Sequence, residues 1–276
     1  MADASRVCVW QIVYAQLTQL LAAERSGQQL ALQPYSAARV VRDAISHHVD
    51  VLCAEPRDRL PACSLDLLCK RSTIGPVAME TVYQHVRDDV MARATELATS
   101  RGLTLNALLL GSLASLLHKH SQSSRFAIQH TYLGRRADQL EAVGSFSTWV
   151  PMVFSFEGDP SLLHTCRHAL RETLAVLKSV AVGGGAAAGT EVPSFAYELN
   201  DMRPMPRPAS MPELADVEGR SGGVKLSDVF FIVNQYVDGY SVLVPYDAGM
   251  YERDAIEALV MEWMQLWVLA AGQLVP

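Results

Sequence analysis

Apolar residues recur at helical spacing along much of this sequence. Residues 7–25 form one apolar face that ends before Gly27, and residues 34–66 predict a second helix and a loop. Further helices are predicted at residues 89–101, 104–120, 160–179 and 255–271. Residues suited to a helix N-terminus precede or open three of them, namely Asp89, Thr104 and Asp159 with Pro160. These amphipathic helices need an apolar surface to pack against.

Shorter apolar or alternating runs predict strands between the helices. They occupy residues 82–86, 126–133, 149–156, 228–236 and 240–246. The last two runs are joined through Val237-Asp238-Gly239, and Asp-Gly is a preferred pair for a tight hairpin turn. Loops are predicted at residues 182–189, which are almost entirely glycine and alanine, and at the proline-rich residues 201–223.

This order of elements predicts an α/β fold of the α+β two-layer sandwich type. We expect one mixed sheet containing the strands that begin at Phe126, Trp149, Asp228 and Tyr240. One face of the sheet should be covered by helices with a single apolar stripe, which begin at Thr104, Pro160 and Ala255.

The composition excludes several classes of function. The 276 residues include 23 basic and 29 acidic residues, a formal net charge of −6 that provides no basic surface for nucleic acid. No uninterrupted apolar stretch reaches the roughly 18 residues needed to span a bilayer, and the first residues do not resemble a secretory signal. The 5 cysteines form no CxxC pair, which favours free thiols in a reducing compartment. We therefore expect a soluble, cytoplasmic protein that binds neither nucleic acid nor membrane.

Four blocks of sequence, in order along the chain, resemble the condensation domains of nonribosomal peptide synthetases. Residues 104–120 resemble that family's TxxxxLLAAFALLLHRYSG segment, and the LGRRADQLEAVGSF core of residues 126–146 resembles its GRxxxELxxxIGFF turn. Val192-Pro193-Ser194-Phe195 stands where the family often has HQDVPFE. Residues 227–236 and 246–267 resemble its closing FxxxFNLQ and YxxxLFDxxTIxxLxxHFxxLL segments. The resemblance is to the C-terminal half of the domain, in the chloramphenicol acetyltransferase-like superfamily.

The resemblance implies two lobes, each like chloramphenicol acetyltransferase, with the active site between them and an HHxxxDG motif closing the first lobe. Residues 7–25 resemble the helix that follows this motif, so we expect this chain to lack the first lobe and its general-base histidine. Residues 1–80 should form N-terminal helices and a connecting segment. Residues 81–276 should form a domain that resembles the C-terminal lobe.

A tunnel for the phosphopantetheine arm of a carrier-tethered substrate is also implied. His130 and Thr148 lie on predicted strands that line this tunnel in the family. In the family's IGFFVNT stretch the Asn-Thr pair is replaced by Thr148-Trp149, and the large indole of Trp149 is expected to narrow the tunnel. We expect no bound metal and no bound cofactor besides this tethered arm.

Two segments are similar to HHxxxDG without matching it. The pair His47-His48 has no glycine at the required spacing. Residues 233–239 have the right length and end in Asp238-Gly239, but Val233 and Asn234 replace the histidines and neither titrates near neutral pH. The remaining catalytic candidates are His130, Asn234 and Asp238.

Two other groups of residues give weaker support for a metal site or a catalytic site. His164 and His168 lie four residues apart on a predicted helix but lack a third ligand for a metal ion. Ser112 follows Gly111 inside a predicted helix and lacks the GxSxG elbow of a serine hydrolase. We expect solvent-facing histidines and a serine that packs.

The expected function is that of a truncated condensation-like protein of nonribosomal peptide or hybrid polyketide biosynthesis. It should bind a carrier protein or synthetase module, or complete an active site with a partner N-terminal lobe, and be inactive alone. Two alternatives stay open: acetyltransferase-type acyl transfer by a homo-oligomer with His130 as base, and a non-catalytic docking module for a tailoring enzyme. Association is expected through an apolar surface on residues 7–25 that includes Trp10, Tyr14 and Leu17.

Overall fold

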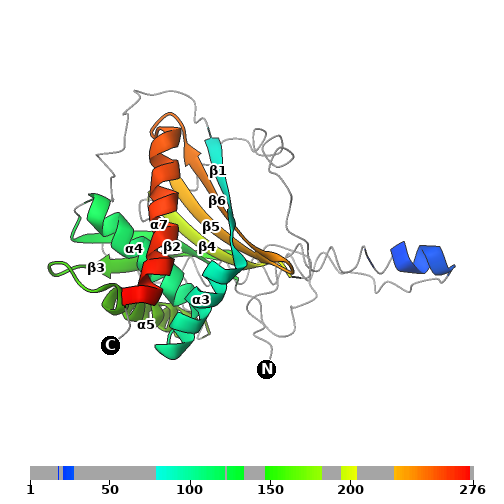
Figure 1. Ribbon diagram of the computed structural model, residues 1–276, viewed down its shortest axis with the longest axis horizontal. Helices are drawn as coiled ribbons and strands as arrows, with labels where there is room; N and C mark the ends of the chain where they lie inside the picture. The colour runs from blue at the N-terminus through cyan, green and yellow to red at the C-terminus, as the bar shows by residue number, and fades with distance from the viewer. Residues whose placement is uncertain are drawn as a thin grey trace.

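The computed structural model describes residues 18, 21–27, 79–121, 123–133, 147–181, 194–203 and 227–273. In these residues a mixed six-stranded sheet packs against helices (Figure 1). The strands are β1 (Met79–Val86), β2 (Arg125–Leu133), β3 (Ser147–Ser155), β4 (Phe195–Asp201), β5 (Val229–Tyr236) and β6 (Gly239–Asp247). The helices are α3 (Asp88–Ser100), α4 (Leu105–Ser121), α5 (Leu162–Ala181) and α7 (Arg253–Gln273).

The strand order in the sheet is β1-β6-β5-β4-β2-β3. Strand β4 runs parallel to both β2 and β5, whereas the β1–β6, β5–β6 and β2–β3 pairs are antiparallel. A parallel pair needs a crossover connection, and α5 lies in the chain between β3 and β4. The predicted mixed sheet and α/β sandwich are therefore confirmed.

Strand β4 is the element that the sequence pattern missed. Phe195 and Tyr197 are fully buried, whereas Glu198 and Asn200, which alternate with the apolar residues, are only half-buried. This alternation is the signature of a strand with one covered face. The second half of this seven-residue strand is polar and is followed by a segment rich in proline. From the sequence alone, these residues therefore resemble the beginning of a loop.

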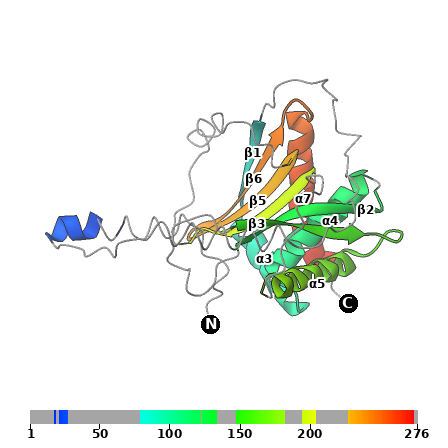
Figure 2. The same ribbon diagram turned by 180° about the vertical axis from the view of Figure 1, so that it is seen from behind.

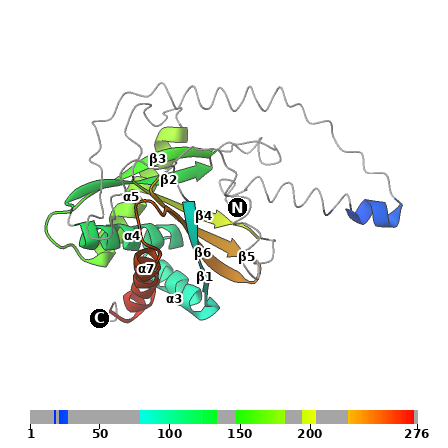
Figure 3. The same ribbon diagram turned by 90° about the horizontal axis from the view of Figure 1, so that it is seen from above.

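The core lies between the sheet and the helices, and α3, α4 and α7 lie together on one side of the strands (Figure 3). Trp263 of α7 is fully buried, and its ring centroid lies 6.2 Å from that of Tyr197 and 5.4 Å from that of Phe231. Its indole N–H donates to the backbone oxygen of Leu109 at 3.2 Å and to Ser112 Oγ at 3.0 Å. Ser112 is thus buried and serves packing.

Helices α4 and α5 approach each other closely at Gly111. A Cβ atom at this position would lie 2.5 Å from the Cα atom of Cys166 on α5. Only a residue without a side chain fits this crossing, which explains the glycine inside an otherwise leucine-rich helix.

The predicted N-terminal residues of the helices agree with the structure in some cases and differ from it in others. Thr104 caps α4, since its Oγ1 accepts a backbone N–H at 3.1 Å. Asp89 does not cap α3, because the N-cap residue is Arg87, whose guanidinium donates to the Asp89 carboxylate at 2.9 Å. Helix α5 begins at Leu162, two residues later than predicted, with Ser161 directly before it.

Some expectations lie outside the described residues, namely the helix at 34–66 with His47-His48, the loop at 182–189, and Trp10, Tyr14 and Leu17. Residues 21–26 are helical, and Gly27 has φ of 66°, as expected for a residue that ends a helix. Of the described helices, none is by itself long and apolar enough to cross a membrane; α3 and α4 pass only as a pair bent by 100°.

Candidate functional site

Strand pairing divides the side chains of the sheet into two faces. One face packs against α4 and α7, and the other, which we call the distal face, points away from them (Figure 2). The distal face includes positions that alternate with the core residues, among them Tyr83, His85, Gln129, Thr131, Trp149, Pro151, Ala196, Glu198, Asn200, Phe230, Ile232, Asn234, Tyr236, Ser241 and Leu243.

A row of amides and hydroxyls crosses the middle of the distal face. Asn200 Nδ2 donates to Asn234 Oδ1 at 3.1 Å, and Asn234 Nδ2 donates to the Tyr236 hydroxyl at 3.3 Å. Ser241 pairs with Asn234 on one side and with His85 on the other. Asn234, one of the catalytic candidates from the sequence, is part of this row. Its amide forms hydrogen bonds with two neighbours, and it has no titrating group to serve as a base.

Beside this row lies Glu198, which the sequence analysis did not single out. It is half-buried on β4, and Ile232 of β5 is its paired neighbour. Burial raises the pKa of this carboxyl to about 6, while the nearby side chains of Thr131 and Asn200 act in the opposite direction. A carboxyl that titrates near neutral pH is a functional-site candidate.

An aromatic pair lies on the same face. Trp149 on β3 and Phe230 on β5 have ring centroids 5.2 Å apart at an interplanar angle of 65°. The two residues belong to strands separated by β2 and β4, so their side chains reach toward each other across the face. Trp149 thus lies on the distal face and packs against Phe230 there.

His130 lies on the opposite face of the sheet from Trp149, since His130 pairs with Val150 and Trp149 pairs with Thr131. Its Nδ1–H donates to the backbone oxygen of Tyr197 at 3.2 Å, and its Nε2 accepts from Asn106 of α4 at 3.4 Å. Burial lowers the pKa of this histidine to about 4. A general base must reach its substrate, and this imidazole faces the helices. Thr148 pairs with Tyr132, and the surroundings of its side chain lie outside the described residues.

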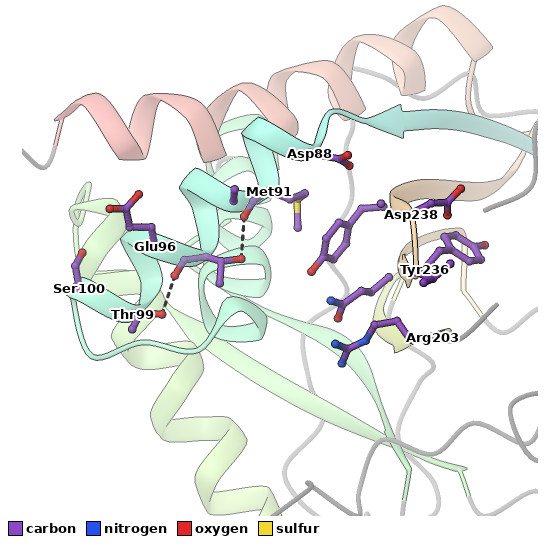
Figure 4. A pocket seen from close by; sticks show the side chains of 14 residues that line it. Asp88, Met91, Glu96, Thr99, Ser100, Arg203, Tyr236 and Asp238 are labelled. Atoms are coloured by element: carbon purple, nitrogen blue, oxygen red, sulfur yellow. Dashed lines mark hydrogen bonds between the residues drawn. The ribbon is translucent and has the colours of Figure 1, made fainter. Parts of the chain in front are cut away.

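Asp238 lies at the tip of the β5–β6 hairpin, where the two-residue turn Val237-Asp238 is followed by Gly239 with φ of 137°. This tip borders an open groove of about 870 Å³ between the hairpin and α3 (Figure 4). Asp238 is exposed there, and Glu198 does not line this groove.

Three polar side chains of the groove form hydrogen bonds within their own segment of the chain. Thr95 and Thr99 each donate to a backbone oxygen one turn earlier in α3, at 2.8 Å. Arg203 makes a two-pronged contact with Asp201, at 2.8 and 2.6 Å. None of these hydrogen bonds involves Asp238, so they give no support to a catalytic role for it.

Neither histidine of α5 belongs to a metal site in the described residues. His164 is exposed, and His168 Nε2 donates to the backbone oxygen of Val153 at 2.9 Å. Within the part of the chain that the structure describes, no three His, Cys, Asp or Glu side chains form a group that could hold a metal ion.

Comparison with known proteins identifies the fold. No protein-family model matches the sequence, and no curated protein matches it significantly. Among solved structures, the epimerization domain from the third module of tyrocidine synthetase B matches 98% of this chain and 68% of its own, with a TM-score of 0.66 at 12% identity. The first condensation domain of the CDA synthetase matches 97% of this chain and 63% of its own, with a TM-score of 0.65 at 14% identity.

The PapA2 acyl transferase has the same architecture, with a TM-score of 0.60 at 14% identity over 97% of this chain and 63% of its own. The chain thus has the fold of nonribosomal peptide synthetase condensation and epimerization domains. It spans between 63% and 68% of the length of these three structures. The predicted chloramphenicol acetyltransferase-like fold is confirmed.

Proposed function

We propose that this chain binds a carrier-tethered acyl substrate as one part of a condensation-type active site, which a partner lobe completes. The observation that carries the proposal is the likeness of 97% of this chain to a condensation domain of which it spans 63%. The distal face supports it, because polar, aromatic and titratable side chains gather on the side of the sheet away from its helices.

Catalysis in isolation is not expected. Condensation by general-base catalysis needs a group that titrates near neutral pH within hydrogen-bond reach of the attacking amine. Among the histidines that the structure describes, His85 at the β1 edge is the one whose position falls on the distal face. It is exposed and contacts the Tyr83 hydroxyl at 3.4 Å, in contrast to a base held in a closed site. A second lobe would close the distal face.

Trp149 sets the shape of the proposed substrate channel. Its contact with Phe230 covers one end of the distal face, so the phosphopantetheine arm would lie along the side of Glu198, Asn200 and Asn234. The indole replaces a small side chain of the family pattern and would limit the width of the acyl group that enters.

Binding experiments with carrier proteins from the same gene cluster test this proposal. We expect a carrier with an acyl-phosphopantetheine arm to bind more tightly than the same carrier without the arm, measured by calorimetry. Trp149→Ala should change the difference in affinity between the two forms of the carrier. Met261→Ala, at an exposed position of α7, should leave it unchanged. Equal affinity for both carrier forms would contradict the proposal and favour the docking-module alternative.

A separate experiment tests the acetyltransferase alternative. Acyl transfer by the pure chain, lost in His130→Ala, would support it, and the likeness to the PapA2 acyl transferase keeps this test worthwhile. The helix-covered position of His130 argues against such a result. Activity that appears only after a separate first lobe is added would support the split active site. We also propose that the protein acts in the cytoplasm, where synthetase modules would meet it.

A further inference from the structure

Helix α5 lies at the outer edge of the helical layer (Figure 2). Its inner side packs on α4, where Gly111 meets Cys166, and on β3, where the ring centroid of His168 lies 5.4 Å from that of Phe154. Phe154 belongs to the core face of the sheet. Helix α5 therefore lies on the side of the sheet opposite the distal face.

The outer side of α5 carries a row of basic and apolar residues. Arg167, Arg171 and Leu174 are exposed and follow one another at intervals of four and three residues, the spacing that places side chains on one side of a helix. His164, three residues before Arg167, is exposed on the same side. We call these four residues the α5 stripe. Its apolar member, Leu174, is 47% exposed.

The two arginines of the α5 stripe have no carboxylate partner in the part of the chain that the structure describes. Neither guanidinium forms an ion pair there. Glu172 follows Arg171 in the sequence, but it is half-buried and is turned by about 100° around the helix axis. In contrast, three exposed arginines of other elements each contact a carboxylate of their own segment, namely Arg87, Arg203 and Arg253.

We propose that the α5 stripe is a docking site for an acidic amphipathic helix of a partner protein. Guanidinium groups bind carboxylates through paired N–H donors. Arg167 and Arg171 are about 6 Å apart along the helix axis, which is one turn, so two carboxylates one turn apart on a partner helix match them. Leu174 adds an apolar contact next to these charges, and arginine is among the residues that contribute most to binding energy in interfaces.

Other anionic partners match the α5 stripe less well. Proteins that bind DNA or RNA neutralise several phosphates, whereas this chain has a net charge of −6. Attraction to an anionic membrane uses clusters of about 4–8 lysines and arginines, and the stripe has two arginines. An exposed leucine beside two guanidinium groups is suited to a helix that carries both acidic and apolar side chains.

This inference goes beyond the proposed function and does not depend on it. The α5 stripe lies on the helix-covered side of the sheet, so a partner that docks there leaves the distal face accessible to a carrier-tethered substrate. Because α5 packs on the edge strand β3, the docked partner would be held at that edge of the sheet.

The test uses a designed acidic helix. The probe is a peptide with blocked ends made of three Glu-Ala-Ala-Leu-Glu-Ala-Leu repeats, and its uncharged match has glutamine in place of every glutamate. NMR titrations of the isotope-labelled full chain should show binding of the acidic peptide, with the largest amide shifts in α5. The uncharged match should bind about tenfold more weakly. Binding of the acidic peptide should weaken severalfold between about 50 and about 300 mM salt, because the charges of the stripe are exposed.

Variants locate the binding. Arg167→Gln and Arg171→Gln should each weaken binding of the acidic peptide about threefold, the usual size for an exposed ion pair. Leu174→Ala should weaken it as well, through the lost apolar contact. Arg93→Gln, at an exposed arginine of α3, removes the same charge from another helix and should bind like the parent. Circular dichroism of each variant checks that it folds.

Equal binding of the two peptides, or no binding of the acidic one, would overturn the proposed docking site. A loss in Arg93→Gln as large as that in Arg171→Gln would also overturn it, in favour of unspecific attraction between charges. Tighter binding of a DNA duplex or of phosphatidylserine vesicles at the same arginines would overturn the choice of a protein partner. Peptide binding without any carrier binding would retain the α5 stripe and contradict the proposed function, and the reverse result would do the opposite.

Discussion

The indole of Trp149 on β3 meets the ring of Phe230 on β5 at 5.2 Å between centroids, although β2 and β4 lie between these strands. Ala196 of β4 is the paired neighbour of Phe230 and is fully buried. A small side chain at this position leaves room for two rings to meet above it. The contact therefore ties one edge of the sheet to its centre on the distal face.

A double-mutant cycle measures this contact. Trp149→Leu and Phe230→Leu should each lower the free energy of unfolding, and the double variant should lose less than the sum. The expected coupling is about 1 kcal/mol, the usual size for an aromatic pair beyond its buried area. Urea denaturation of the four proteins gives the value, and strictly additive losses would show that the two rings do not interact in solution.

The crossing of α4 and α5 gives a second prediction. Gly111→Ala should lower the free energy of unfolding by about 1–3 kcal/mol, because the added Cβ meets the Cα atom of Cys166 at 2.5 Å. Ser115→Ala on the same helix is the control, since it removes a buried hydroxyl without a hydrogen-bond partner and should leave stability unchanged or higher. Equal stability of Gly111→Ala and the parent would contradict the packing described.

Much of the fold was predictable from the sequence, because five strands and the described helices bury apolar positions at regular spacing. Strand β4 was missed because half of its residues face the distal side and are polar. The face of the sheet on which His130 lies could also be predicted from the sequence. In β2, His130 follows Phe126 and Ile128 at intervals of two residues, and both of these are fully buried. Side chains two residues apart in a strand share a face, so His130 lies on the face covered by helices.

The candidate site was less predictable. Trp149 was found because it replaces a residue of a family pattern. Glu198 carries no motif, and its half-burial next to Thr131 arises only when β4 inserts between β2 and β5. The sequence alone does not show which groups surround the Glu198 carboxyl, so its raised pKa could not be predicted without the tertiary structure.

His130 gives a prediction about acid stability. Its pKa is about 4 in the folded chain against an ordinary value of 6.5, so below pH 6.5 the unfolded chain binds a proton that the folded chain does not. Stability should therefore fall as the pH drops from about 6.5 to about 4, by about 3 kcal/mol from this group. His130→Gln should flatten this part of a urea-midpoint profile, whereas His164→Gln, at an exposed histidine, should leave it unchanged. Parallel profiles of His130→Gln and the parent would contradict the buried neutral imidazole.

Glu198 should affect stability in the opposite direction. Its folded pKa of about 6 lies above the ordinary value of 4.5, so the folded chain holds the carboxyl proton more tightly than the unfolded chain. Its contribution is most favourable below about pH 4.5 and is lost as the pH rises to about 6, a change of about 2 kcal/mol.

Replacing this carboxyl with a neutral amide should remove that loss. At about pH 7 we expect Glu198→Gln to be more stable than the parent by up to about 2 kcal/mol, and at about pH 4 the two should unfold at nearly the same urea concentration. The control Glu96→Gln, at an exposed carboxylate of α3, should match the parent at both pH values. If Glu198→Gln is instead less stable than the parent at about pH 7, the carboxylate has a stabilising partner in solution, which would contradict a pKa raised by burial.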